Sequence, residues 1–246
     1  MDNYNNNLYR EEYKYYVSDQ SLEFLRSNLS LFMHLDENLR PETNTYTVSS
    51  LYFDTPFSND FDEKVDGVRS REKYRLRIYN HSEEIIKFEC KKRVETVINK
   101  ISTTISKNIS EDLINGDFKG LILKKDNFLN KSYGKLTGAG YQPSVIVEYD
   151  REAFTLPYGN IRITFDKNLR TYNSCKDLHE LDQNPYTPVF LDKVQILEVK
   201  FSLPLPNHIR RIISKVAAPR CAISKFVMGQ KYIERSPWQD KIDAPF

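Results

Sequence analysis

Charged residues recur two positions apart in four segments of this chain that otherwise have the composition of β-strands. The segments are REEYKYYV (residues 10–17), KYRLRIY (73–79), KFECKKR (87–93) and QILEVKF (195–201). Successive side chains of a strand point to opposite faces of a sheet, so charges two apart share one face and the apolar residues between them share the other. The sets that share a face are Glu12 with Lys14, Arg75 with Arg77, Glu89 with Lys91 and Arg93, and Glu198 with Lys200. Four strands that repeat basic residues with a carboxylate on one face predict a polyanionic ligand.

The composition gives almost no net charge, so an anion-binding site would depend on local clusters of cations. The chain has 246 residues, a length that one large domain can take up, and 36 Lys+Arg against 34 Asp+Glu give a net charge of +2. A nucleic-acid-binding protein would carry a larger overall basic excess, so nucleic acid is not an expected partner. Any anion site must arise from the local concentration of cations.

Cysteine spacing and the terminal segment bear on location. Cys90, Cys175 and Cys221 are far apart and form no CxxC pair, which argues against a disulfide framework or a zinc site. The first residues lack the basic and apolar regions of a signal peptide. No segment approaches the roughly 20 apolar residues that cross a bilayer. We therefore expect a cytoplasmic chain that does not itself span a membrane.

The alternation of residues predicts eight strands and a few helices. Strands are expected over 9–17, 46–53, 73–79, 85–93, 97–105, 144–150, 161–166 and 194–201. Helices are expected over 18–33, over 110–136 with a break near Gly116 and Gly120, and from Asn207 to Val216, whereas 168–188 is expected to form a loop. This order predicts a mainly β, α+β fold: an eight-stranded closed antiparallel barrel with amphipathic helices outside and the charged face in its lumen.

No repeat or change of composition divides the chain. We expect one domain over residues 8–234, with a disordered N-terminal tail over 1–7 and a C-terminal tail over 235–246.

The usual catalytic motifs are absent. The sequence has no GxxxxGK[ST], no GxGxxG after a strand, no HExxH and no GxSxG. For any one charged pair, a solvated face with cross-strand salt bridges of about 0–1 kcal/mol is the alternative. Two like charges about 6 Å apart repel by roughly 3 kcal/mol at an effective dielectric near 20, so clustering them favours a bound anion. Guanidinium groups suit phosphate because they donate two hydrogen bonds at once.

Carboxylates alternate with these basic residues. Glu12, Glu89, Glu148 and Glu198 could hold Mn²⁺ or Mg²⁺, which prefer oxygen ligands and commonly bridge phosphates, although some of the four could only balance charge. Phosphoryl transfer requires in-line positioning, a metal and cations around the transferred group. The residue types of this set supply all three.

A series of short motifs, in order and spacing, resembles the VTC domain. This is the catalytic domain of the vacuolar transporter chaperone polyphosphate polymerase, within the CYTH or triphosphate tunnel metalloenzyme superfamily, and the resemblance covers residues 8–232. The motifs are Arg10-x-Glu12-x-Lys14-Tyr15, Ser50-Leu51-Tyr52-Phe53-Asp54, Arg75-Leu76-Arg77, Glu89-Cys90-Lys91, Tyr149-Asp150-Arg151-x-Ala153-Phe154, Arg162-Ile163-Thr164-Phe165-Asp166, Glu198-Val199-Lys200 and Ser224-Lys225-Phe226.

The resemblance implies a tunnel that binds ATP and polyphosphate or triphosphate and moves the ATP γ-phosphate to a growing chain with a divalent metal. The catalytic cations it implies are Lys14, Arg75, Arg77, Lys91, Arg151 and Arg162. Further substrate-binding cations are expected at Lys200, Lys225, Lys100, Arg93 and Arg10. Glu198 resembles the metal-binding carboxylate of the family.

One departure from the superfamily pattern bears on the reaction. Hydrolytic and cyclase members open with ExExK, whereas this chain has Arg10 at the first Glu position, which favours a polymerase. A triphosphatase and a non-catalytic polyphosphate-binding module remain alternatives. The sequence contains no sensing or membrane segment and so resembles stand-alone bacterial members, which implies a possible separate integral membrane protein as partner and, through it, association with a membrane.

Overall fold

The structure is a computed structural model that describes residues 11–95, 97–123, 125–172, 177–190, 193–216 and 219–234. The expected tails over 1–7 and 235–246 lie outside the described residues, as do Arg10 and Cys175.

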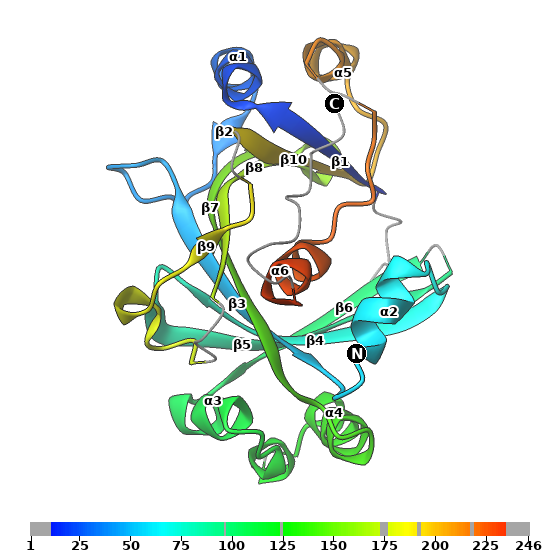
Figure 1. Ribbon diagram of the computed structural model, residues 1–246. Helices are drawn as coiled ribbons and strands as arrows, with labels where there is room; N and C mark the ends of the chain where they lie inside the picture. The colour runs from blue at the N-terminus through cyan, green and yellow to red at the C-terminus, as the bar shows by residue number, and fades with distance from the viewer. Residues whose placement is uncertain are drawn as a thin grey trace.

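One antiparallel sheet forms the centre of the molecule (Figure 1). Its eight long strands are β1 (Glu11–Ser18), β3 (Tyr46–Asp54), β4 (Ser70–Tyr79), β5 (Ser82–Val94), β6 (Val97–Ile105), β7 (Gln142–Leu156), β8 (Ile161–Tyr172) and β10 (Val194–Phe201). They follow the spatial order β1-β10-β8-β7-β3-β4-β5-β6, and two-residue strands β2 (His34–Leu35) and β9 (Thr187–Pro188) pair with β7 and β8. All eight predicted strands are confirmed, although several are longer than expected.

The prediction of a closed barrel is not confirmed. The sheet curls around helix α6 (Lys225–Glu234), yet β1 and β6, the two ends of the strand order, share no ladder within the described chain (Figure 1). Side chains cross this gap, as where Lys91 Nζ of β5 lies 3.4 Å from Glu12 Oε2 of β1, and the Cys221 amide before α6 donates to the Lys14 carbonyl of β1 at 3.0 Å. A period of two fixes the face on which each side chain lies, but it does not reveal whether the first and last strands pair.

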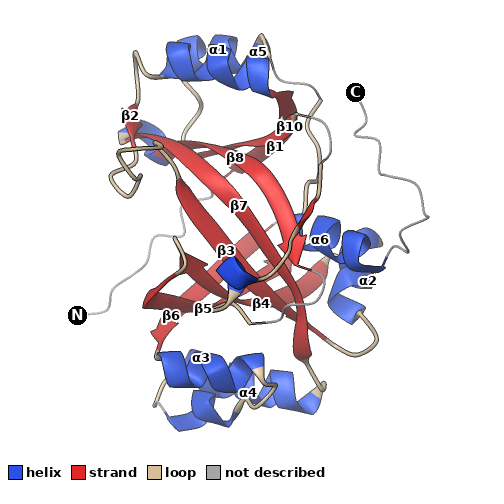
Figure 2. Ribbon diagram, turned by 60° about the vertical axis from the view of Figure 1, so that its left-hand side comes forward, coloured by secondary structure: helices blue, strands red, loops and turns tan. Residues whose placement is uncertain are grey.

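The outer face of the sheet, turned away from α6, is covered by helices at both ends (Figure 2), and the residues buried under these helices are apolar. At one end lie α1 (Asp19–Leu29) and α5 (Asn207–Ser214), which bury Leu25 and Ile209 against Val199. Helix α1 begins where the Ser18 hydroxyl accepts a hydrogen bond from the Ser21 amide, a standard N-cap. The expected helices over 18–33 and 207–216 are therefore confirmed in slightly shorter form.

At the other end of the outer face lie α3 (Lys107–Ile114), the short 3-10 helix η1 (Lys119–Leu123) and α4 (Asn127–Gly138). Leu113 and Leu129 pack with Phe88 of β5. Gly116 ends the α3 segment with φ +82°, a conformation that glycine adopts without strain, so the predicted break in the helical pattern is confirmed.

Two helices were not predicted. Helix α2 (Asn59–Val65) lies in the charged loop before β4, and α6 lies against the inner face of the sheet, which is the face turned towards it. A Cβ on Gly229 would come within 2.6 Å of Val147 Cγ2, so only glycine permits this close packing. Because Phe226 also packs there with Val145 and Ile196, part of the inner face is apolar.

Part of the predicted loop over 168–188 is also ordered differently. Strand β8 continues to Tyr172, and a short 3-10 helix, η3 (Leu181–Gln183), precedes β9.

Candidate anion-binding site

Strands β1 and β10 form a square of alternating charges on the inner face. Lys14 lies opposite Glu198, and Glu12 lies opposite Lys200. Lys14 Nζ is 3.3 Å from Glu198 Oε1, while Lys200 Nζ is 3.1 Å from one oxygen of each glutamate. Two of the predicted carboxylates and two of the predicted cations are thus brought together.

Strands β7 and β8 and helix α6 extend this square. Arg151 binds Asp166 through two hydrogen bonds of 2.6 and 2.7 Å, and it also lies 3.6 Å from Glu198 Oε2. Lys225, at the start of α6, lies 2.7 Å from Glu198 Oε1 and 2.5 Å from Asp166 Oδ2. Helix α6 therefore places the Lys225 ammonium group at the centre of the site.

The charges hold one another in the ionised state. Burial alone would raise the pKa of Glu198, but Lys14, Lys225 and their neighbours hold it well below its usual range. Burial opposes ionisation of Glu12 as well, yet Lys14, Lys200 and Lys91 lower its pKa to about 2. Both carboxylates are negative at neutral pH.

A second group of cations lies on β4, β5 and β6. Arg75 Nε donates to Glu89 Oε2 at 2.7 Å, and Lys100 Nζ lies 2.6 Å from the other oxygen of Glu89. Burial would raise the pKa of Glu89, but Arg75, Arg77 and Lys100 lower it to about 2. Burial lowers the pKa of Lys91 to about 8, even though Glu12 opposes this shift.

Arg77 differs from its neighbours because it forms no salt bridge with any residue that the structure describes. Its side chain is 7% exposed, and its guanidinium donates to Ser50 Oγ at 3.0 Å and to Tyr149 Oη at 3.5 Å. Glu89 lies close enough for Arg77 to lower its pKa, but no carboxylate lies in direct contact with the Arg77 guanidinium among the described residues. A buried cation without a direct ionic partner is costly, so an anion bound beside it would be favourable.

Sequence reasoning missed two inner-face residues that the alternation could have revealed. Lys73 shares the face of Arg75 and Arg77, lies 4.2 Å above the Phe226 ring and has a pKa lowered to about 7 by burial and by Lys64. Asp166 follows Arg162 at a spacing of four, which places both on one face of β8.

The remaining predicted cations lie towards the margins of the inner face. Arg162 donates to Tyr46 Oη at 3.0 Å and lies 2.7 Å from Asp36 Oδ2. Arg93, near the end of β5, donates to the Glu95 carbonyl at 2.6 Å. Neither forms a salt bridge to the carboxylates around Lys225, although Arg162 is the cross-strand neighbour of Lys200.

Glu148 lies on the outer face, apart from the other predicted carboxylates. It accepts hydrogen bonds from Ser49, from Arg170 Nε at 2.8 Å and from Tyr172 Oη at 2.9 Å, and it lies 2.7 Å from His81 Nε2. A cavity of about 600 Å³ adjoins this cluster. Glu148 and Arg151 are three residues apart on a strand, so they face opposite sides, and grouping Glu148 with the inner-face residues was wrong.

The predicted carboxylates only partly fit a metal ion. Within the described ranges, no three His, Cys, Asp or Glu side chains gather in a metal-binding arrangement. Mg²⁺ commonly uses one or two carboxylates and completes its coordination with water and substrate phosphate. Glu198 and Glu12, which share Lys14 and Lys200 as partners, fit that requirement. Glu89 and Glu148 lie in separate clusters.

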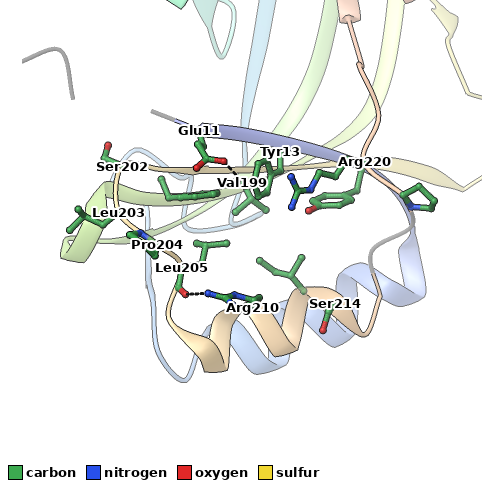
Figure 3. A pocket seen from close by; sticks show the side chains of 14 residues that line it. Glu11, Tyr13, Val199, Ser202, Leu203, Pro204, Leu205, Arg210, Ser214 and Arg220 are labelled. Carbon is green, nitrogen blue, oxygen red and sulfur yellow. Dashed lines mark hydrogen bonds between the residues drawn. The ribbon is translucent and has the colours of Figure 1, made fainter. Parts of the chain in front are cut away.

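A cavity of about 650 Å³ lies on the outer face between β1, β10 and α5 (Figure 3). Its wall is mainly apolar, and Arg220 stacks 3.5 Å from the centre of the Tyr13 ring. It contains none of the predicted site residues, so the chemistry described above belongs to the inner face.

The family model described as VTC domain matches residues 9–233, and the chain belongs to this family. No curated protein matches it significantly. Together with the inner-face cations, this membership indicates an activity directed at triphosphate-related substrates. Among the described helices, none has the length and apolar character needed to cross a membrane.

Solved structures similar in shape have low identity. One from Bacillus halodurans, provisionally described as an adenylate cyclase, has 14% identity and a TM-score of 0.47 and covers 94% of this chain and 96% of its own. One from Vibrio parahaemolyticus with the same description, identity and TM-score covers 89% and 96%. The PH1819 protein of Pyrococcus horikoshii OT3 has 16% identity, a TM-score of 0.42 and coverages of 84% and 85%. The family assignment rests on the family model.

Proposed function

We propose that this chain is an ATP-dependent, divalent-metal-dependent polyphosphate polymerase domain. ATP and a polyphosphate chain bind along the inner face, and the γ-phosphate of ATP is transferred to the end of the chain. The observation that carries this proposal is the buried Arg77 guanidinium, which forms no salt bridge with a described residue. The VTC domain membership supports a phosphate chain as the missing anion.

Among the residues that the structure describes, the inner face has more cations than carboxylates, which suits a ligand with several negative charges. Its cations are Lys14, Lys73, Arg75, Arg77, Lys91, Lys100, Arg151, Arg162, Lys200 and Lys225. The carboxylates within salt-bridge distance of them are Glu12, Asp36, Glu89, Asp166 and Glu198. A bound phosphate chain would supply the charge that these carboxylates do not balance.

In the proposed reaction, a terminal oxygen of the polyphosphate attacks the γ-phosphorus of ATP. A new P–O bond forms, the bond to the β–γ bridging oxygen breaks, and ADP leaves with that electron pair. Arg75 and Arg77 hold one part of the phosphate chain, and Arg151 and Lys225 neutralise charge near Glu198. A divalent metal, held by Glu198 and Glu12, would polarise phosphate oxygens when bound.

The test is a product assay on the purified chain with ATP and Mn²⁺. We expect polyphosphate and ADP from the wild type. The rate should fall about 100-fold or more in Arg75→Ala, which loses a cation that holds the phosphate chain, and in Glu198→Gln, which loses a carboxylate that would hold the metal. Arg210→Ala, which removes an exposed outer-face cation, is the matched control and should leave the rate unchanged.

Each alternative gives a different result in the same assay. No polymer and no ADP from the wild-type chain, in the presence of metal, would refute the polymerase. Free phosphate without chain growth would identify a triphosphatase. Tight tripolyphosphate binding that survives a chelator, with no turnover, would identify a binding module.

A further inference from the structure

The hydroxyl of Thr164 on β8 is buried and has no hydrogen-bond partner among the residues that the structure describes. Its side chain is fully buried, at 0% exposure. Buried hydroxyl groups in folded proteins are almost always paired, because removing one from water without a new partner is unfavourable. This exception therefore requires an explanation.

Thr164 lies within the cluster of charges on the inner face. Its cross-strand neighbours are Glu198 on β10 and Ala153 on β7, and Arg162 and Asp166 flank it at a spacing of two on its own strand. Residues at these positions share one face of the sheet. The hydroxyl is thus directed to the face that carries the site.

The nearby carboxylates are already engaged. Lys225 contacts both Glu198 and Asp166, and Arg151 holds Asp166 through two hydrogen bonds. The strongest acceptors beside Thr164 are therefore occupied by charged donors. An additional acceptor is missing from the centre of the cluster.

We propose that Thr164 Oγ donates a hydrogen bond to a non-bridging oxygen of the bound phosphate chain, between Arg151, Arg162 and Lys225. This inference rests on the proposed function in one respect, which is that the ligand is a phosphate chain. A neutral hydroxyl adds a donor without adding another cation to a cluster whose members already repel one another. The surrounding Arg and Lys side chains have several rotatable bonds, so the entering phosphate displaces them from the hydroxyl.

Thr171 provides a matched control on the same strand. It is also 0% exposed, but its hydroxyl donates to the Ile146 carbonyl at 2.9 Å. Valine has nearly the shape of threonine and lacks the hydroxyl, so Thr164→Val and Thr171→Val make the same chemical change in an unpaired and a paired setting.

The experiment measures thermal unfolding and tripolyphosphate binding by calorimetry for the wild type, Thr164→Val, Thr164→Ser and Thr171→Val. Thr164→Val should leave the melting temperature unchanged or raise it by up to about 2–4 °C. It should weaken tripolyphosphate binding about tenfold. Thr164→Ser should retain most of the affinity. Thr171→Val should lower the melting temperature by about 2–4 °C and leave the affinity unchanged.

Two results would overturn the inference. Thr164→Val that binds tripolyphosphate as tightly as the wild type would show that the hydroxyl does not contact the ligand. Thr164→Val that melts as much below the wild type as Thr171→Val would show that the hydroxyl already has a partner in the free protein. Failure of the premise that the ligand is a phosphate chain differs from both, because the wild-type chain itself would then bind no tripolyphosphate. Failure of polymerase activity alone is seen in the product assay and leaves the binding comparison intact.

Discussion

Glu148 and Glu198 are both buried glutamates that contact cations, but they lie on opposite faces of the sheet and in different charge balances. Around Glu148, two of the four partners are the neutral hydroxyls of Ser49 and Tyr172. Its charged partners are shared with other acids, since Arg170 also binds Asp150 and His81 also binds Asp182. The charges and hydrogen-bonding groups of the outer cluster therefore pair with one another.

Glu198, in contrast, contacts the cations Lys14, Lys200, Lys225 and Arg151. Among the described residues of the inner face, cations exceed acids, and the buried Thr164 hydroxyl has no hydrogen-bond partner. Both clusters contain a buried carboxylate with a low pKa. Burial would raise the pKa of Glu148, but hydrogen bonds from His81 and Ser49 lower it to about 2. The two clusters differ because the inner face has more cationic hydrogen-bond donors than carboxylates, which favours ligand binding there.

The largest expected difference is in stability and its rescue. Glu148→Ala should lower the free energy of unfolding by about 3–5 kcal/mol, because it leaves buried donors without their acceptor, and tripolyphosphate should raise its stability only by as much as it raises that of the wild type. Glu198→Ala should also destabilise the chain, but tripolyphosphate should restore much of the loss by replacing the carboxylate. Urea unfolding with and without tripolyphosphate measures both. Equal rescue of the two variants would remove the distinction between the faces.

Substitutions of one arginine on each face should have effects of intermediate size on ligand affinity and stability. Arg77→Ala should weaken tripolyphosphate binding about 10- to 100-fold, since it removes charge-assisted hydrogen bonds, and should cost little stability because Arg77 lacks a salt bridge. Arg170→Ala should do the reverse, with a lower unfolding free energy and unchanged affinity. Calorimetric titration of folded protein checks the affinities. A similar affinity loss in both variants would contradict the assignment.

The smallest effect is a pH dependence confined to the outer cluster. The hydrogen bond to Glu148 raises the pKa of His81 above its usual 6.5, against the opposing effect of burial. Because the pKa of His81 is higher in the folded than in the unfolded protein, its interaction stabilises the fold fully below pH 6.5. This contribution is lost as the pH rises through the folded-state pKa. His81→Gln should therefore cost roughly 1 kcal/mol at pH 5.5 and less at pH 9, as measured by urea unfolding. An equal cost at both pH values would show that His81 is neutral.

The sequence predicted the strands and their charged face because both follow from a local period of two. Arg75, Arg77, Lys91 and Glu198 lie on the inner face as the alternation requires. Their separation into two groups depends on the order of strands in the sheet, and that order is set by long-range pairing that no local pattern records.

Helix α6 shows why the remainder of the site could not be predicted. Its segment lacks a strong amphipathic pattern, because several of its sides contact protein within the curve of the sheet. Gly229, which permits its close approach to Val147, has the appearance of an ordinary glycine in the sequence. The ion pairs of Lys225 with Asp166 and Glu198 follow from this placement, so they became visible only in three dimensions.

The open ladder between β1 and β6 affects how a long polymer would associate with this protein. A continuous ring of strands would oblige a chain to thread by its end. Here β1 and β6 share no ladder within the described chain, and Glu12 of β1 instead contacts the side chain of Lys91 on β5. Such a contact separates and re-forms without breaking the sheet. Under the proposed polymerase function, an internal stretch of polyphosphate could then load sideways and leave by the same route, which would favour distributive over processive elongation.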